Sequence, residues 1–335
     1  MILFSFFTKL LHIFPGEIAH TIALKGLKVI YSIGLLNLVI DDIPQKTDTP
    51  INLNTKNMNN KLGIAAGLDK NAEYIDCLAA LGIGFIELGT VTPRPQSGNP
   101  KPRLFRIKKE KALINRLGFN NKGVDYFVSK LKERKSNVII GSSIGKNFDT
   151  PNDRAHEDYL HCFEKVYEYT DYIAINISSP NTKDLRELTH SQYLSKLIGK
   201  LKSKQQELSN LHGYKPIFLK ISPDEDLNQL KKICNSIIEN EIDGVICSNT
   251  SINHDHFDGQ GGLSGAPLKE RSTSCLRLVK SLVGDTIPII ASGGVMSVSD
   301  FEEKLEAGAD YVQLYTGFIY EGPKLIKDIV NRCTK

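Results

Sequence analysis

The chain has no tryptophan, only three methionines and no long hydrophobic run in its 335 residues. Its most apolar charge-free stretch near the N-terminus, residues 29–40, is too short to cross a bilayer, which takes about 20 residues. Charge is nearly balanced, with 42 basic against 38 acidic residues, so nothing in it argues for a nucleic-acid partner. With 41% apolar and 24% charged residues, the composition excludes a disordered or collagen-like chain.

Cysteine is present six times, but never in a pattern that binds metal. No two cysteines form C-x-x-C, and none has the spacing of a zinc ligand. We therefore expect no metal site, and free, mostly packed thiols in a reducing compartment. The six are Cys77, Cys162, Cys234, Cys247, Cys275 and Cys333.

The N-terminal 45 residues form a region with its own pattern. Residues 1–14 are apolar, but they lack the basic start and the cleavage site of a signal peptide. Pro15 separates them from a second helix-like segment, 16–40, and the two segments predict a hood of two amphipathic helices. Such helices lie in a membrane interface or pack as ordinary core; their basic residues suit anionic headgroups and favour the membrane. A polar stretch, 41–60, predicts a linker and a short hairpin.

After residue 60, within an expected catalytic domain of residues 46–335, the chain repeats one unit, a short apolar run followed by a helix-period segment. Runs that are apolar at almost every position are typical of parallel strands buried on both faces. Eight such units predict an α/β fold, a (β/α)8 TIM barrel. An open doubly wound sheet is the alternative, but no G-x-G-x-x-G follows the first strand. The strands are expected at 62–69, 84–91, 137–145, 171–179, 216–222, 243–250, 287–294 and 310–317.

The carboxyl ends of these strands are polar. In a barrel they all project onto the face where active sites lie, so they predict a site for a large polar ligand. Glycines gather there in three places, 261–265, 293–294 and 315–317, and their backbone N–H groups can approach an anion. Tight turns are the other explanation of these glycines. Three clusters near the last strands, where phosphate sites are common in this fold, favour a phosphate.

Two lysines, Lys70 and Lys220, end the first and fifth strands. Each can form a Schiff base, hold a carboxylate or an electron-rich ring, or make a salt bridge, for instance Lys70 with Asp69. Ser179 follows the fourth strand, where it can accept a proton only with help or merely cap a turn. Asn115 follows a long proline-rich loop, 92–106, of the kind that is often functional, and can donate to a carboxylate.

Together these motifs resemble class 2 dihydroorotate dehydrogenase, the membrane-associated, quinone-reducing type. The hood and the serine at 179 separate class 2 from class 1, which resembles it in the barrel but uses a cysteine base and lacks the extension. The resemblance covers essentially the whole chain. Its matching segments are 15–20, 65–70, 87–106, 114–121, 144–151, 174–182, 248–250, 261–265, 292–294 and 315–323.

The resemblance implies one FMN per chain. Its phosphate would lie on the Gly265, Gly294 and Tyr315 side, its ring over Ala66 and Gly67, and Lys220 would stabilise negative charge on the reduced flavin. The implied cofactor residues are Ala66, Gly67, Leu68, Asp69, Lys70, Thr90, Ser143, Asn176, Lys220, Ser248, Gly265, Gly294, Tyr315 and Thr316.

The resemblance also implies oxidation of (S)-dihydroorotate to orotate in de novo pyrimidine (UMP) biosynthesis. Ser179 would take the C5 proton while the C6 hydride passes to the flavin. A quinone would reach the flavin through the hood, with His20 and Arg106 near its head. The implied substrate residues are Lys70, Asn115, Arg116, Leu117, Gly118, Phe119, Asn176, Asn181, Asn249 and Thr250.

The chain departs from the family at two positions: Ser143 stands where an asparagine is usual and Ser248 where a threonine is usual. Ser143 is therefore expected to be the weaker flavin contact. We expect a monomer, peripheral on the cytoplasmic side of a bacterial inner membrane. The rival functions are a class 1-type enzyme, a Schiff-base aldolase or lyase that uses Lys220, and a barrel without catalysis.

Overall fold

The computed structural model describes residues 11, 13–36, 51–53, 56–182, 185–189 and 191–333. The first expected N-terminal helix, over residues 1–14, lies largely outside these ranges. The boundary expected at residue 45 between hood and barrel also lies outside them.

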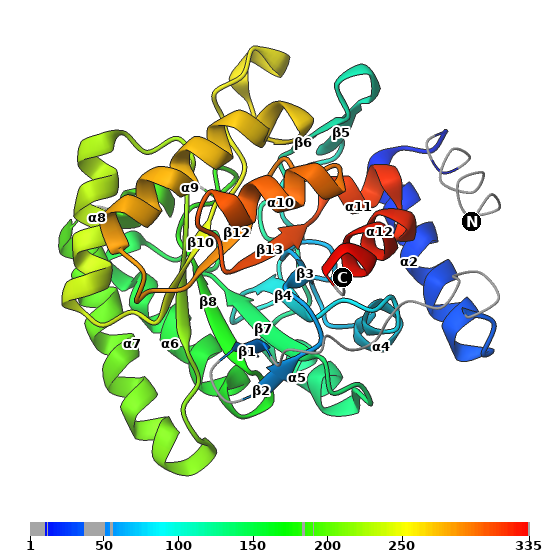
Figure 1. Ribbon diagram of the computed structural model, residues 1–335. Helices are drawn as coiled ribbons and strands as arrows, with labels where there is room; N and C mark the ends of the chain where they lie inside the picture. The colour runs from blue at the N-terminus through cyan, green and yellow to red at the C-terminus, as the bar shows by residue number, and fades with distance from the viewer. Residues whose placement is uncertain are drawn as a thin grey trace.

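Eight parallel strands close into a barrel around a buried interior (Figure 1). All eight expected strands are present, and the chain order is the spatial order, which confirms the (β/α)8 barrel. The observed strands are shorter than the expected ones because the polar residues at their ends leave the ladder and form the loops of the rim. They are β3 (Leu62–Ile64), β4 (Phe85–Val91), β7 (Ile139–Ile144), β8 (Tyr172–Asn176), β9 (Ile217–Ile221), β10 (Gly244–Cys247), β12 (Ile289–Ser292) and β13 (Tyr311–Leu314).

Helices surround the barrel, and two of them were not expected. One, α6 (Ala155–Val166), buries Tyr159, Cys162, Phe163 and Val166, an i, i+3, i+4, i+7 spacing that the sequence already carries. The other is the short α11 (Thr316–Glu321). The remaining helices are α4 (Ile75–Ala79), α5 (Val124–Glu133), α7 (Ser191–His212), α8 (Leu227–Glu239), α9 (Lys269–Val283), α10 (Val298–Glu306) and α12 (Pro323–Cys333).

The amino-terminal end of the barrel is closed by large side chains. The expected hairpin forms there as β1 (Ile51–Leu53) and β2 (Lys56–Met58), and Met58 joins a buried cluster with Tyr172 and Phe218. A Cβ on Gly141 would lie 2.0 Å from the Tyr172 ring, so glycine is needed for the aromatic side chain to fill this end. Any ligand of the barrel must therefore enter from the opposite mouth.

A second, three-stranded sheet stands on that mouth and was not expected. In it β6 (Ala112–Asn115) pairs antiparallel with both β5 (Leu104–Ile107) and β11 (Gly262–Gly265). Asn115 and Gly262 are register partners, although 147 residues separate them in the chain. The sheet thus joins the loop after β4 to the loop after β10.

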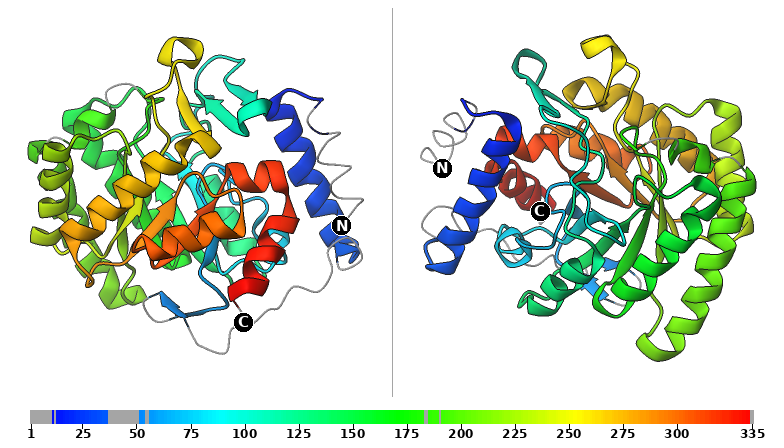
Figure 2. Two further views of the ribbon diagram at one scale, coloured as in Figure 1. Left: turned by 45° about the horizontal axis from the view of Figure 1, so that its top comes forward. Right: turned by 180° about the vertical axis from the view of Figure 1, so that it is seen from behind.

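The second hood helix is α2 (Gly16–Ser32), which lies along one flank of the barrel beside β5 and α11 (Figure 2). Its Glu17 carboxylate accepts a hydrogen bond from Arg103 Nη2 at 3.0 Å. Large apolar side chains on its outer side stay exposed, among them Ile18, Ile22 and Val29. In the described part of the chain, no helix is both long and apolar enough to cross a membrane.

All six cysteines are free thiols, and five of them are buried. Cys333, near the C-terminus, is half-buried. The expectation of packed, unpaired thiols is confirmed.

Candidate active site

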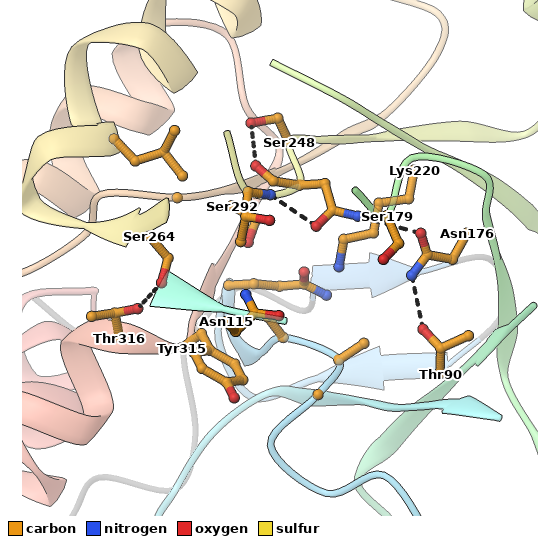
Figure 3. A pocket seen from close by; sticks show the side chains of 18 of the residues that line it. Thr90, Asn115, Asn176, Ser179, Lys220, Ser248, Ser264, Ser292, Tyr315 and Thr316 are labelled. Carbon is orange, nitrogen blue, oxygen red and sulfur yellow. Dashed lines mark hydrogen bonds between the residues drawn. The ribbon is translucent and has the colours of Figure 1, made fainter. Parts of the chain in front are cut away.

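The mouth of the barrel holds a polar cavity of about 980 Å³. Figure 3 shows side chains from β4, β8, β9, β10 and the last strands converging on it. Most expected site residues line it: Ala66, Gly67, Lys70, Thr90, Asn115, Leu117, Phe119, Asn176, Ser179, Asn181, Lys220, Ser248, Asn249, Thr250, Gly265, Gly294, Tyr315 and Thr316.

Several lining residues were not singled out from the sequence. Ser264, Ser292 and Gln313 carry hydroxyl or amide groups and lie at the ends of β11, β12 and β13. The position of Ser292 at the end of its strand is a signal that would have found it, and Gln313 is visible as an amide inside an apolar run, whereas Ser264 lies in a strand that the sequence did not predict. Ala65, Leu268, Gly293, Val295 and Gly317 complete the lining.

Five expected site residues lie outside the lining of this cavity: Leu68, Asp69, Arg116, Gly118 and Ser143. The Asp69 carboxylate accepts from the backbone N–H groups of Glu73 and Tyr74 at 2.9 and 2.7 Å, ahead of α4. Burial raises the pKa of Asp69 to about 6, although these hydrogen bonds act in the opposite direction. Asp69 therefore shapes the loop rather than facing the cavity.

The side chains of Arg116 and Ser143 also lie outside the cavity lining and contact other residues. The Arg116 guanidinium donates to Gln260 Oε1 at 2.9 Å and lies over the rings of Phe105 and Phe257. The Ser143 hydroxyl is hydrogen-bonded to Thr90 Oγ1 at 2.9 Å. Ser143 thus supports a residue that lines the cavity, whereas the Arg116 guanidinium contacts residues outside that lining.

Lys220 ends in a buried ion pair on the cavity floor. Its Nζ donates to Glu87 Oε1 at 2.9 Å, and Gln313 Nε2 donates to the other oxygen of Glu87 at 2.7 Å. Glu87 is fully buried and was missed, although a lone acid in the apolar strand β4 was a visible signal. Among the three uses considered for Lys220, the salt bridge is present, and it fixes the ammonium against the cavity.

Lys70 differs from Lys220 in its partner. Its Nζ donates to Asn120 Oδ1 at 2.8 Å, while the Asp69 carboxylate is engaged with backbone N–H groups, so the salt bridge considered for this pair is absent. Burial, and next the nearby Arg103 charge, lower the pKa of Lys70 to about 7. A carboxylate placed beside this ammonium would favour its charged form.

Amide side chains in two hydrogen-bonded pairs, Asn176 with Asn249 and Asn115 with Asn181, form a belt along the cavity wall. Asn176 Nδ2 donates to Thr90 Oγ1 at 2.8 Å, and its Oδ1 accepts from Asn249 Nδ2 at 3.3 Å. Asn181 Nδ2 donates to Asn115 Oδ1 at 2.8 Å. The Ser179 hydroxyl, 6% exposed, lies within this belt and accepts from the Asn181 backbone N–H at 3.3 Å.

The end of the cavity near β11 and β12 is lined by glycine backbone that packs closely against its neighbours. Gly265 has φ +97°, and a Cβ there would lie 2.2 Å from the Lys111 carbonyl oxygen; at Gly294, φ +78°, it would lie 2.3 Å from Lys269 Cα. Only glycine allows this close backbone path. The hydroxyls of Ser264 and Thr316, 2.8 Å apart, stand beside it.

A second pocket, of about 810 Å³, lies between α2 and the barrel. His20 and Arg106, the residues expected near a quinone head, are among its lining. His20 Nε2 is hydrogen-bonded to the Leu68 carbonyl oxygen at 2.8 Å, and burial lowers the pKa of His20 to about 4. Arg106 donates to the carbonyl oxygens of Leu11, at 3.4 Å, and Phe14. The other lining residues are Leu11, Gly16, Ala19, Ala23, Leu24, Leu27, Leu68, Leu104, Leu113, Phe318, Ile319, Gly322 and Pro323.

Comparison with known proteins agrees with this arrangement. The family model described as Dihydroorotate dehydrogenase matches residues 50–335. The chain is 54% identical over 279 residues to the dihydroorotate dehydrogenase (quinone) of Aliivibrio salmonicida, covering 81% of this chain and 83% of the relative. It is 48% identical over 321 residues to the enzyme of that name from Methylobacillus flagellatus, covering 94% of each.

A solved structure is similar over nearly the same length. The crystal structure of DHODH from Eimeria tenella in complex with ferulenol superposes with a TM-score of 0.84 at 34% identity, covering 94% of this chain and 89% of that one. The barrel, the two pockets and these relatives together lead to one conclusion: the chain belongs to the dihydroorotate dehydrogenase family.

Proposed function

We propose that this chain oxidises (S)-dihydroorotate to orotate and delivers the electrons, through FMN, to a membrane quinone. The observation that carries the proposal is a pair of pockets lined by adjacent residues, Gly67 in one and Leu68 in the other. The first has many polar groups in its lining, and the second is almost entirely apolar. A polar cyclic acid fits the first, and an apolar ring with a lipid tail fits the second. The relatives named dihydroorotate dehydrogenase (quinone) support the same reaction.

The cavity fits FMN at both ends. The glycine backbone at 265 and 294, with the Ser264 and Thr316 hydroxyls, offers donors to a phosphate. Thr90, Asn176, Lys220 and Ser248 offer polar groups to the ring. Bound FMN would supply a two-electron acceptor that takes the substrate hydride and is reoxidised by the quinone. The Lys220 ammonium, held by Glu87, would stabilise negative charge at the ring.

Ser179 would be the base that takes the C5 proton of dihydroorotate. An unaided serine is a weak base, so its position and its exclusion from water have to contribute to the rate. The hydroxyl is buried at the cavity wall, and the amide belt around it can hold the substrate ring. Lys70 and Asn115 would hold the substrate carboxylate, and Asn176, Asn181, Asn249 and Thr250 its ring amides and carbonyls.

The quinone would reach the second pocket from a membrane. Exposed apolar side chains of α2, with Lys25 and Lys28 on the same helix, suit a peripheral contact with anionic lipid. We infer that residues 1–45 form this quinone-access hood and residues 46–335 the catalytic barrel, in a monomer on the cytoplasmic side of a bacterial inner membrane. Orotate would then feed de novo pyrimidine biosynthesis.

An absorbance spectrum of the purified protein tests the proposal. We expect a yellow protein that bleaches with dihydroorotate in the absence of oxygen and regains its colour with a quinone. A colourless protein that is trapped on Lys220 by borohydride would instead support the aldolase or lyase. Reoxidation by fumarate or NAD⁺ but not by quinone would support a class 1-type enzyme.

A further inference from the structure

One arginine near the proposed base binds three separate loops of the rim. Arg186 lies in the 3-10 helix η4 (Leu185–Thr189), which follows the Ser179 segment. Its Nε donates to the Ser178 carbonyl oxygen and its Nη2 to the Thr250 carbonyl oxygen, both at 3.3 Å. Its Nη1 donates to Asp224 Oδ2 at 3.1 Å. The guanidinium therefore joins the segments after β8, β9 and β10.

Asp224 extends the same connection. Besides Arg186, its carboxylate accepts from Ser251 Oγ at 2.5 Å, from the Ile252 backbone N–H at 2.9 Å and from Arg271 Nη1 at 3.4 Å. Its side chain is only 12% exposed. The acid thus anchors the residues that immediately follow Asn249 and Thr250.

The connected loops carry the residues on which the chemistry would depend. Ser178 directly precedes Ser179, and its Oγ accepts from Asn249 Nδ2 at 3.0 Å, so a direct bond runs parallel to the arginine bridge. Arg186 itself is not among the residues that line the cavity. It can therefore act on the reaction only by holding other groups in place.

We propose that Arg186, clamped by Asp224, is a positioning residue that keeps the Ser179 hydroxyl and the Asn249–Thr250 edge of the cavity in one fixed arrangement. The inference rests on the proposed function, because it assigns Arg186 to the step in which Ser179 takes the substrate proton. A displacement of about 1 Å in such a group can slow a reaction about 100-fold. A guanidinium presents five N–H donors in a rigid planar fork, whereas a lysine ammonium is a compact charge on a flexible stem, so lysine can replace the charge but not span the three loops.

An ordinary ion pair would behave differently. Exposed pairs contribute little to stability and nothing to one half-reaction in particular. The Arg186 side chain is 22% exposed and spends two of its three hydrogen bonds on backbone carbonyls beside the site. An ion pair alone would not require these two backbone contacts, whereas a residue that holds the loops in place does.

The experiment uses the holoenzyme with four variants: Arg186→Ala, Arg186→Lys, Asp224→Asn and Arg134→Ala. The last is the matched control, because Arg134 lies in the loop that precedes β7, at the closed end of the barrel, and its Nη1 donates to the Tyr169 carbonyl oxygen at 3.0 Å. Stopped-flow absorbance measures the limiting rate of flavin reduction by dihydroorotate and, separately, reoxidation of the reduced flavin by a short-chain quinone. Thermal unfolding and orotate affinity are measured alongside.

We expect Arg186→Ala to slow flavin reduction about 10- to 100-fold. Arg186→Lys and Asp224→Asn should give intermediate rates, while quinone reoxidation stays within about twofold of the unsubstituted enzyme. If Arg186→Ala does not fold, the lysine and asparagine variants decide the question. Reduction rates that match the Arg134→Ala control, or an equal slowing of both half-reactions, would overturn the inference. Failure of dihydroorotate to reduce the unsubstituted protein would instead overturn the proposed function.

Discussion

The cavity at the barrel mouth and the pocket beneath α2 are lined by adjacent residues, Gly67 and Leu68, yet they are built in opposite ways. Strand ends from around the whole barrel supply the cavity, and hydrogen bonds such as that from Asn176 to Thr90 connect its polar side chains to one another. The pocket lies between a single helix, α2, and the rim of the barrel. The polar side chains that line it, His20 and Arg106, are hydrogen-bonded to backbone carbonyls.

This difference indicates which parts of the reaction each region can control. A rigid, hydrogen-bonded cavity can orient a substrate and a cofactor, whereas an apolar pocket under a single helix can admit ligands of varied shape. The two half-reactions should therefore be separable by substitution. A substitution in one region that slowed both half-reactions equally would contradict this separation.

The largest effect is expected from Ser179→Ala. Loss of a general base costs about 10²- to 10⁴-fold, so flavin reduction should slow by that factor at neutral pH while FMN stays bound and quinone reoxidation is unchanged. Stopped-flow reduction by dihydroorotate measures it. Ser142→Ala is the control, since the buried Ser142 Oγ has no hydrogen-bond partner in the described structure and does not line the cavity. A Ser179→Ala enzyme as fast as this control would remove serine from the mechanism.

The next largest effect is expected from a substitution that fills the pocket beneath α2. Ala19 is 7% exposed and lines that pocket, so Ala19→Trp should fill it and slow reoxidation by a quinone more than about tenfold. Reduction by dihydroorotate should keep its rate. Ile22→Trp places the same ring on the exposed side of the helix and should change neither rate when a water-soluble quinone is used. Equal slowing in both variants would mean that quinone does not use this pocket.

A smaller effect is expected in the pH dependence of orotate affinity. The pKa of Lys70 is lowered to about 7 by burial and by the Arg103 charge, so its ammonium loses its proton as pH rises through 7. A bound carboxylate favours the protonated form, and orotate affinity should therefore be constant below pH 7 and fall up to tenfold per pH unit above it. Titration of the flavin spectrum with orotate from pH 6 to 8.5 measures this. The Lys70→Ala variant should bind orotate weakly, with an affinity that does not change with pH. If its affinity still fell above pH 7 as in the unsubstituted enzyme, the titrating proton would belong to another group.

Sequence periodicity was sufficient for the barrel because its eight strands are buried on both faces and therefore read as unbroken apolar runs. It also placed most rim residues, since the carboxyl ends of parallel strands share one face. Glu87 is visible in the sequence as a lone acid in an apolar run, but its partner Lys220 is 133 residues away, and no local pattern reports such a pairing. The sheet of β5, β6 and β11 was missed for the same reason: its register depends on contacts between distant loops.

The same limit explains three expected residues whose side chains bond elsewhere than the cavity: Asp69, Arg116 and Ser143. Position after a strand indicates that a residue is near the mouth, but the direction of its side chain depends on its neighbours. Asp69 is drawn to the N–H groups ahead of α4, and Arg116 to Gln260 and two aromatic rings. Loop conformation decided these cases, and only coordinates supply it.

The smallest effect tests whether a residue outside the cavity lining affects FMN affinity only through a lining residue. Ser143→Ala removes the hydroxyl bonded to Thr90 Oγ1, while Thr90 keeps its bond from Asn176, so the loss should be near the 1 kcal/mol of one buried hydrogen bond. FMN affinity, measured by flavin fluorescence on refilling the apoenzyme, should weaken only about fivefold. Thr90→Ala removes a residue that lines the cavity and should weaken it more. An equal loss in the two variants would mean that Ser143 contacts the flavin ring itself.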